Sequence, residues 1–372
     1  MKVLRKMMIA VLILISVLVV AGYFILQHPK FGKAPSGKRL ERIKKSPHYK
    51  NDSFDNLSFT PQLAEDTSMP KVMYRFLFGK NENAKPKQKF NFTKGDLKNL
   101  NPNENVFVWM GHSSYFLQID GKKILVDPVF SGNASPFSFT TKAFAGSDLY
   151  ATDDIPELDY LIISHDHWDH LDYETVTKLL PKVKQVITGL GTGEHLEYWG
   201  YKPEKIIELD WGEKADLGNG FKIYAETARH FSGRTLKRNQ AIWASFVFET
   251  PERKIYLGGD SGFDDHFEKI GKKHGGFELA ILELGQYNKD WRFIHMLPEE
   301  FLVAAKNLNV KHIIPVHNSK FELSLHGWKE PLEKITELNK TEKLPLITPK
   351  IGEIVSWQDE TKIYGNWWEA YD

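Results

Sequence analysis

The densest group of reactive side chains is the loop His165–His170, which has the pattern H-x-H-x-D-H. The loop follows directly on the short apolar segment Asp159–Ser164. So many imidazoles and carboxylates in one short loop do not suit a packed core, because buried polar groups require partners. Imidazole and carboxylate are ligands that suit Zn²⁺, and also Mn²⁺ or Fe²⁺. The loop therefore predicts a metal site.

The spacing divides these side chains into two sets. In a tight loop, His165 and His167 point to one side and can bind one ion. Asp169 and His170 turn to the other side and can bind a second. Taken singly, a later strand-end histidine or turn aspartate has an ordinary structural explanation. Three such residues nevertheless follow strand-like segments in order, and we expect them to complete the two sets: His230, Asp260 and His317.

Composition excludes several kinds of site. The 372 residues include no cysteine, so disulfides, thiolate ligands and a cysteine nucleophile are ruled out. The formal net charge is +1, from 49 basic and 48 acidic residues, which gives no electrostatic indication of nucleic-acid binding. Apolar residues make up 41% of the chain, enough for a sizeable core. Oligomeric state is not indicated.

The segments that must position the ligands fall into two β-rich blocks, each followed by helix–strand units. Asp120-Gly121 between two β-rich runs predicts a hairpin. The strands expected in the first block are Val106–Met110, Tyr115–Ile119, Lys123–Val126, Asp159–Ser164 and Val186–Thr188. Those expected in the second are Phe221–Thr227, Ala241–Glu249, Lys254–Leu257, Leu279–Leu284 and His312–Val316. The expected helices are Tyr173–Leu180, Glu268–Lys273 and Pro298–Asn309. This α/β pattern suits two sheets packed face to face with helices outside them.

The order of the candidate ligands resembles the metallo-β-lactamase superfamily. Within it, the chain is most similar to the N-acylphosphatidylethanolamine-hydrolysing phospholipase D family and its bacterial relatives. The resemblance covers about residues 101–338, roughly two thirds of the chain. It rests on the ligands and on these segments: Trp109–Ser114, Asp127–Ser131, Ala134–Pro136, Gly259–Gly262, Gly285–Tyr287, His295 and Pro298–Glu300. It implies the αββα four-layer sandwich of that superfamily.

The resemblance also implies roles for single residues. One zinc ion would be held by His165, His167, His230 and Asp260, and the second by Asp169, His170, Asp260 and His317, with Asp260 bridging. Asp169 and Asp260 would thus belong to the catalytic centre. His295 matches a histidine that lies at the substrate phosphate in the family, although a structural histidine is the alternative. His112 is either a neighbour of the ligands or a turn histidine.

The implied activity is that of a zinc phosphodiesterase of the phospholipase D type, in which the two ions activate a water molecule against an N-acylphosphatidylethanolamine-like lipid. The residues Asn318–Lys320 depart from the family, which bears on the substrate rather than on the metals. The alternatives are a lactonase or other small-ester hydrolase, and a non-catalytic membrane-bound module that binds lipid or metal. Aromatic residues in the segment 129–150 could receive acyl chains or pack on the fold.

The N-terminus carries an uncharged apolar run, Met7–Leu26, which as a helix would span ~30 Å, the thickness of a hydrocarbon core. We expect an uncleaved anchor; the rival is a signal peptide cleaved near Val19–Ala21. Basic residues flank the run on both sides, so the charge rule does not decide which side of the membrane the domain occupies. The predicted segments are an anchor or signal at 1–27, a basic linker and extension at 28–100, and the hydrolase domain at 101–372.

Overall fold

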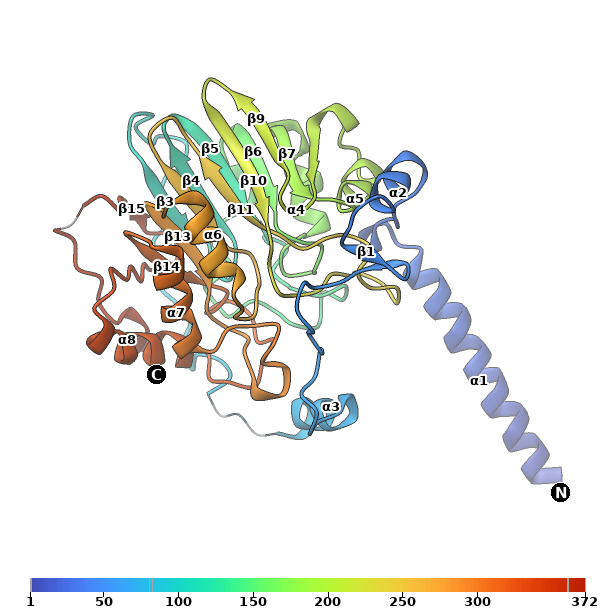
Figure 1. Cartoon of the computed structure of the whole chain (residues 1–372). Helices are drawn as coiled ribbons and strands as arrows, with labels where there is room; N and C mark the ends of the chain where they lie inside the picture. The colour runs from blue at the N-terminus through green and yellow to red at the C-terminus, as the bar shows by residue number, and fades with distance from the viewer. Residues whose placement is uncertain (1, 80, 82, 360, 372) are drawn as a thin grey trace.

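Two mixed β-sheets form the centre of the molecule (Figure 1). The computed structural model describes residues 2–79, 81, 83–359 and 361–371. The first sheet has the strand order β15-β3-β4-β5-β6-β7-β8. Its pairs are antiparallel from β15 to β5 and parallel from β5 to β8. Its strands are β3 (Val106–Trp109), β4 (Tyr115–Ile119), β5 (Lys122–Val126), β6 (Leu158–Ile163), β7 (Val183–Gly189), β8 (Ile206–Leu209) and β15 (Ile354–Val355).

The second sheet repeats this design with the order β14-β13-β12-β11-β10-β9. Its pairs are antiparallel from β9 to β12 and parallel from β12 to β14. Each sheet thus begins as a meander and continues through helical crossovers, so its parallel strands end at one common edge. The strands are β9 (Lys214–Gly218), β10 (Phe221–Glu226), β11 (Ser245–Glu249), β12 (Lys254–Leu257), β13 (Leu279–Glu283) and β14 (Ile313–Val316).

Alternate side chains of the central strands enter different apolar layers. In β11, Phe246 and Phe248 face the layer between the sheets, whereas Val247 faces the outer layer of the second sheet. Because both faces are covered, such strands are near-continuous hydrophobic runs. The covering helices are α4 (Tyr173–Leu179) and α5 (Gly193–Tyr198) on the first sheet, and α6 (His266–His274), α7 (Pro298–Leu308) and α8 (Glu330–Glu342) on the second. The predicted αββα four-layer sandwich is confirmed.

Several elements were not expected from the sequence, namely β8, β9, β15, α5 and α8. The predicted strand Ala241–Glu249 begins only at Ser245. The reason lies in the backbone hydrogen bonds that precede it. Ile242 N–H donates to the carbonyl of Leu190 and Ala244 N–H to that of Ser164, so residues 241–244 bridge to the first sheet instead of extending β11.

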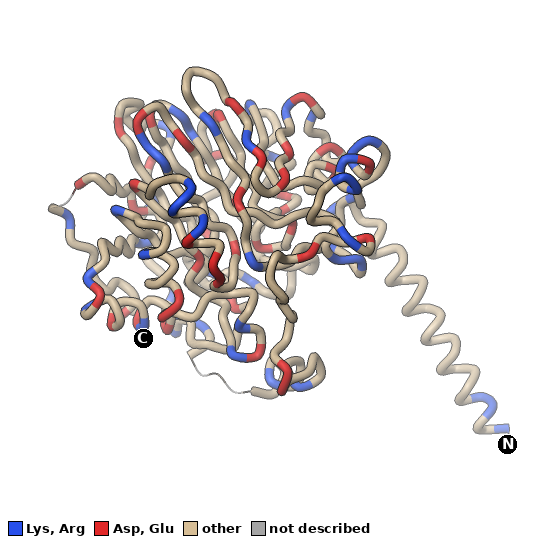
Figure 2. Tube along the Cα trace, in the orientation of Figure 1, with Lys and Arg blue, Asp and Glu red and all other residues tan. Residues whose placement is uncertain are grey.

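The N-terminal part lies outside the two sheets. Helix α1 (Lys2–Leu26) projects from the domain, and no residue in it is buried (Figure 1). By length and composition it meets the requirement of a membrane-spanning helix, and a secretion signal meets it equally. Basic side chains gather just after it, around α2 (Gly37–Ile43) (Figure 2). A short hairpin, β1 (Tyr49–Lys50) and β2 (Ser53–Phe54), and helix α3 (Met69–Phe78) follow along the side of the domain. The domain boundaries themselves stay a prediction.

Replacing Phe246 with Ala should lower the free energy of unfolding by about 3–5 kcal/mol, because the lost ring leaves a cavity between the sheets. Denaturant unfolding of the full chain measures this. Ile363, 92% exposed, is the control, and its Ala variant should unfold like the parent chain. A loss below about 1 kcal/mol for Phe246→Ala would show that the layer between the sheets is not closely packed there.

Candidate metal centre

The candidate ligands meet at the edge of the sandwich where the parallel strands of both sheets end. The loop His165–His170 follows β6 of the first sheet. His230 follows β10, Asp260 follows β12 and His317 follows β14, all in the second sheet. Side chains far apart in the sequence are thereby brought to one place, as the common strand direction predicts.

The first set consists of three ring nitrogens that face one another. His167 Nδ1 lies 2.9 Å from His165 Nε2 and 3.2 Å from His230 Nε2. Tetrahedral zinc with Zn–N bonds of 2.0–2.1 Å would place neighbouring ligand nitrogens roughly 3.3 Å apart. The three rings therefore fit a cation between them with little rearrangement.

The second set is formed by Asp169, His170 and His317, and His112 lies beside it; the ligand atoms of these four residues lie within 4.8 Å of one another. Asp169 Oδ2 is 2.9 Å from His112 Nε2 and 3.5 Å from His170 Nε2. His170 Nε2 is buried and has no hydrogen-bond partner. A buried nitrogen of this kind normally has a partner, and a cation would supply one.

Asp260 lies between the two sets. Its Oδ2 is 3.2 Å from His170 Nε2, 3.7 Å from His230 Nε2 and 3.9 Å from His165 Nε2. Its Oδ1 is 3.3 Å from His317 Nδ1 and has no hydrogen-bond partner. The seven predicted ligands thus come together, and the carboxylate of Asp260 is the group that can contact a cation on either side.

Burial controls the charge of the histidines. It lowers the pKa of His165, His230 and His317 well below the ordinary value, so each ring is neutral and offers a lone pair. Burial also acts to lower the pKa of His170, but the carboxylates of Asp260, Asp169 and Asp127 outweigh it and raise that pKa. A proton on His170 therefore balances negative charge that a divalent cation would otherwise neutralise.

Asp127 is a functional residue that the sequence analysis did not assign. Its Oδ2 is 2.8 Å from His170 Nδ1 and accepts a hydrogen bond from Ser164 Oγ at 2.6 Å, while its Oδ1 accepts from Ser164 N–H at 2.8 Å. A carboxylate behind a ligand histidine fixes the ring and its tautomer. Ser113 is placed similarly, with its Oγ 2.8 Å from His317 Nδ1. Both residues lie in segments that carried the resemblance, which was the available signal.

His112 is not an ordinary turn histidine. It is fully buried, its backbone has a φ of 53°, and its Nε2 contacts Asp169. Its carbonyl accepts from His317 N–H at 2.9 Å, and its own N–H donates to Asn318 O at 3.0 Å. It is therefore a direct neighbour of the second set and could contribute a ligand nitrogen to it.

His295 lies beside both sets. Its ring centroid is 5.0 Å from that of His230 and 5.1 Å from that of His317. Its Nδ1 lies 3.6 Å from Glu283 Oε2. The sequence analysis did not single out Glu283, although it is the one charged residue in the apolar strand β13. Burial raises the pKa of Glu283 to about 7; burial opposes protonation of His295, but Glu283 offsets it and raises the pKa of His295.

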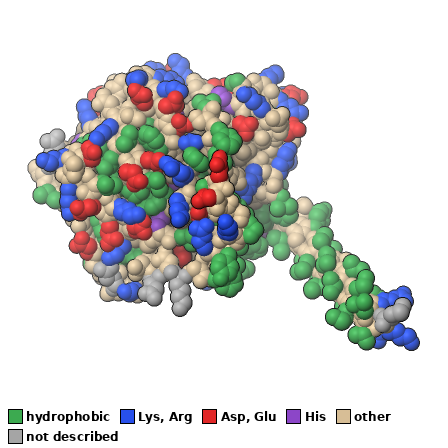
Figure 3. Space-filling view, turned by 60° about the horizontal axis from the view of Figure 1, so that its bottom comes forward, with side chains coloured by type: hydrophobic (Ala, Val, Ile, Leu, Met, Phe, Trp, Pro, Cys, Tyr) green, Lys and Arg blue, Asp and Glu red, His purple; other side chains and the backbone are tan. Residues whose placement is uncertain are grey.

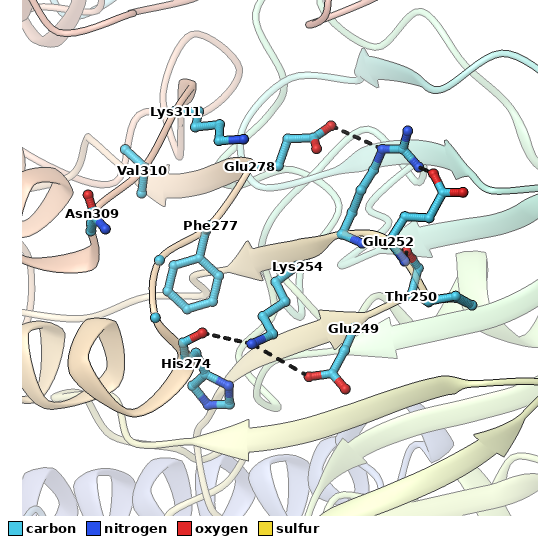
Figure 4. A pocket seen from close by; sticks show the side chains of 14 residues that line it. Glu249, Thr250, Glu252, Lys254, His274, Phe277, Glu278, Asn309, Val310 and Lys311 are labelled. Carbon is cyan, nitrogen blue, oxygen red and sulfur yellow. Dashed lines mark hydrogen bonds and ion pairs between the residues drawn. The ribbon is translucent and has the colours of Figure 1, made fainter.

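A hollow elsewhere in the molecule does not compete with this centre. It has a volume of about 470 Å³ and lies where β12 and β13 begin, at the opposite edge of the second sheet (Figure 4). Several of its charged groups already have protein partners. Lys254 Nζ donates to His274 O at 2.7 Å, and Arg253 Nε lies 3.2 Å from Glu278 Oε1. Paired charges of this kind need no ligand.

Comparison with known proteins agrees with the geometry. A family model described as "Beta-lactamase superfamily domain" matches residues 122–318, just over half of the chain. The chain belongs to the metallo-β-lactamase superfamily. The matched range of this superfamily member begins at β5 and includes every predicted ligand. An uncharacterized protein of Mycobacterium tuberculosis is 33% identical over 332 residues, which cover 87% of each chain.

Two further similarities are informative. The N-acyl-phosphatidylethanolamine-hydrolyzing phospholipase D 1 of Caenorhabditis elegans is 31% identical over 269 residues, covering 66% of this chain and 74% of the relative. The structure of Igni18, a metallo hydrolase from Ignicoccus hospitalis, superposes with a TM-score of 0.52 and 20% identity over 68% of this chain and 97% of that one. This second likeness supports the fold. The chain is thus a metal-dependent hydrolase of this superfamily with grouped His and Asp side chains that can hold metal.

The contact between Asp127 and His170 can be tested with Asp127→Asn. Asn tolerates the φ of 42° at this position, so the backbone should persist while the carboxylate is lost. Metal affinity should fall about 10- to 100-fold, measured as metal retained against a chelator. Asp120→Asn is the matched control, since Asp120 has a φ of 46° and pairs with Arg253 away from the centre. Equal metal retention in both variants would remove Asp127 from this role.

Proposed function

We propose that the chain is a zinc-dependent phosphodiesterase of the phospholipase D type, acting on N-acylphosphatidylethanolamine-like lipids at a membrane surface. In this proposal His165, His167, His230 and Asp260 hold one ion, and Asp169, His170, Asp260 and His317 hold the other. The observation that carries the proposal is His295, a ring beside both ligand sets that is not needed as a ligand. The similarity to the nematode phospholipase D supports the same substrate class.

The chain's own groups have separable tasks in this reaction. When bound, the two cations would lower the pKa of a water molecule and neutralise charge that develops at phosphorus. Asp260 keeps the two ligand sets together, since its two oxygens face different histidines. The Nδ1 of His295 lies 3.6 Å from the carboxylate of Glu283, and its Nε2 could donate to a phosphate oxygen or give a proton to the leaving alcohol oxygen. The P–O bond to the N-acylethanolamine breaks, and the other product is a phosphatidate.

Helix α3 supports a lipid surface as the place of reaction. Its outer side exposes apolar side chains, with relative exposures of 53% for Met73 and 67% for Leu77, and Figure 3 shows hydrophobic side chains gathered on this face. The helix also carries the basic residue Lys71, whereas its other charged residue, Arg75, pairs with Asp290 of the domain at 2.6 Å. Apolar and basic residues together suit the surface of an anionic membrane.

The inner side of α3 connects this surface with the metal centre. Val72 is buried in a cluster with Trp291 and Ile294, and Phe231 packs against the same cluster. Ile294 immediately precedes His295, and Phe231 immediately follows His230. A membrane that contacts the outer side of α3 would therefore lie near the His295 side of the centre.

The aromatic residues of the segment 129–150 separate into two groups. Phe144 is buried in the layer between the sheets, which fits the expectation that these residues pack on the fold. Phe137 and Phe139 are 39% and 74% exposed, and their ring centroids lie 5.6 Å apart. Only these two remain as candidates for contact with acyl chains, and that role stays a proposal.

His295→Gln tests the function directly. The full chain loaded with zinc should release phosphatidate from N-acylphosphatidylethanolamine in mixed micelles, and the variant should lose about 10²–10⁴ in kcat while retaining both metals. His274→Gln is the matched control, because His274 is also buried against a glutamate, Glu226, at 2.7 Å but lies far from the centre. If the chain binds two metals and hydrolyses a lactone or small ester but not the lipid, the proposed phospholipid substrate is wrong.

The membrane contact can be tested separately with Met73→Ser/Leu77→Ser. Turnover of lipid in anionic vesicles should fall roughly 30- to 150-fold, because burying two such side chains contributes on the order of 2–3 kcal/mol. Hydrolysis of a water-soluble phosphodiester should not change. Ile363→Ser, at a still more exposed position outside α3, should leave both rates unchanged. A vesicle rate equal to that of the parent chain would contradict this contact.

A further inference from the structure

The segment 28–62, which we name the strap, lies across the domain. It contacts the backbone of His230, one of the proposed metal ligands. The side-chain amide of Asn56 bonds to both backbone groups of His230. Nδ2 donates to the His230 carbonyl at 2.7 Å, and Oδ1 accepts from the His230 N–H at 3.1 Å. The two residues are 174 positions apart in sequence, so this pairing depends on the strap lying across the domain.

The orientation of this amide is determined by a third group. The indole Nε1 of Trp243 lies 3.1 Å from Asn56 Oδ1, and it also lies 3.0 Å from the carbonyl of Ala228. An indole nitrogen can only donate, so the atom of Asn56 that it contacts must be the oxygen. The ring of His230 is fixed in turn, because its Nδ1 lies 2.9 Å from Ile294 O and its Nε2 faces His167. Asn56 therefore fixes the backbone from which this ring projects.

The strap contacts the other side of the same ligand set as well. The carbonyl of Lys30 accepts from Arg234 at 2.9 Å, and Arg234 donates to the carbonyl of Asp166 at 2.9 Å. Lys33 N–H donates to His195 Nδ1 at 2.9 Å, and His195 Nε2 lies 3.3 Å from Asp166 Oδ2. Asp166 stands between His165 and His167 in sequence. The strap thus supports both segments that carry the first set.

The second set has different supports. Its ring at His170 is held by Asp127, and its ring at His317 by Ser113, and both supports lie in loops between strands of the first sheet. We propose that Asn56 is a positioning residue for His230, and that through it the strap stabilises metal binding by the first set more than by the second. This rests on the proposed ligand role of His230, and not on a lipid being the substrate.

The test compares the full chain with Asn56→Ala and a matched control, Asn339→Ala. Asn339 makes the same pair of bonds in α8, with Nδ2 donating to Leu344 O and Oδ1 accepting from Leu344 N–H, both at 2.9 Å. Each variant therefore loses one amide that bonds both backbone groups of a single residue, but only Asn56 contacts the metal centre. Zinc retained per chain is measured during titration with a chelator.

The parent chain and Asn339→Ala should retain two equivalents of zinc over the same range of chelator. Asn56→Ala should release one equivalent at a chelator concentration roughly 10- to 100-fold lower and retain the other. Asn56→Asp keeps the acceptor for His230 N–H but places a carboxylate against the His230 carbonyl, so it should fall between these results. If Asn56→Ala does not fold, Asn56→Asp takes its place as the test variant.

Thermal unfolding separates positioning from general stability. Without metal, Asn56→Ala and Asn339→Ala should have similar Tm values. Each loses both hydrogen bonds to the backbone of its partner residue, and the Trp243 indole that Asn56→Ala releases keeps its bond to the Ala228 carbonyl. Added zinc should then raise the Tm of Asn56→Ala less than that of the control. The proposal would be overturned if Asn56→Ala retained two equivalents of zinc as tightly as the parent chain does. It would also be overturned if Asn339→Ala weakened zinc binding as much as Asn56→Ala. Because the readout is metal retention, a failure of lipid turnover leaves this result interpretable.

Discussion

The centre depends on the burial of one carboxylate, that of Asp260, which is 3% exposed and surrounded by imidazoles. A buried carboxylate without positive charge nearby is costly, so the site must hold protons or cations. Its position requires the two preceding glycines. A Cβ on Gly258 would lie 2.7 Å from Ile281 O, and one on Gly259 would lie 2.9 Å from Ser164 Cβ. The end of β12 can therefore lie close to β13 at Gly258, and close to the residue that precedes the metal loop at Gly259, only because both side chains are absent.

The two sheets contribute unequal parts to this site. The first sheet supplies the loop with the closest ligand spacing, and the second supplies three single residues from separate strand ends. Neither sheet alone can assemble either ligand set, so packing between the sheets is also a condition for metal binding. Left-handed backbone at Asp127 and His317 is consistent with this, since strained φ values persist where surrounding contacts determine them.

The sequence predicted those parts of the structure that depend on the local spacing of residues or on the placement of ligands at strand ends. The pattern from His165 to His170 indicates metal by itself, and the strand ends indicate where the remaining ligands lie. Asn56 gives no such signal, because an asparagine in a polar segment is ordinary and its partner is remote in sequence. The short edge strands β9 and β15 were missed for a related reason: with alternating exposure or only two residues, they lack the apolar run that marked the central strands.

The position of the strap determines what cleavage within the N-terminal helix would change. Its contacts with the loops of the centre begin at Pro29, whose carbonyl accepts from Trp199 Nε1 at 2.8 Å. Cleavage near Ala21 would therefore remove most of α1 and leave every strap contact in place. A cleaved form and an uncleaved form would have the same candidate metal centre, and only the uncleaved form could be tethered to a membrane by α1.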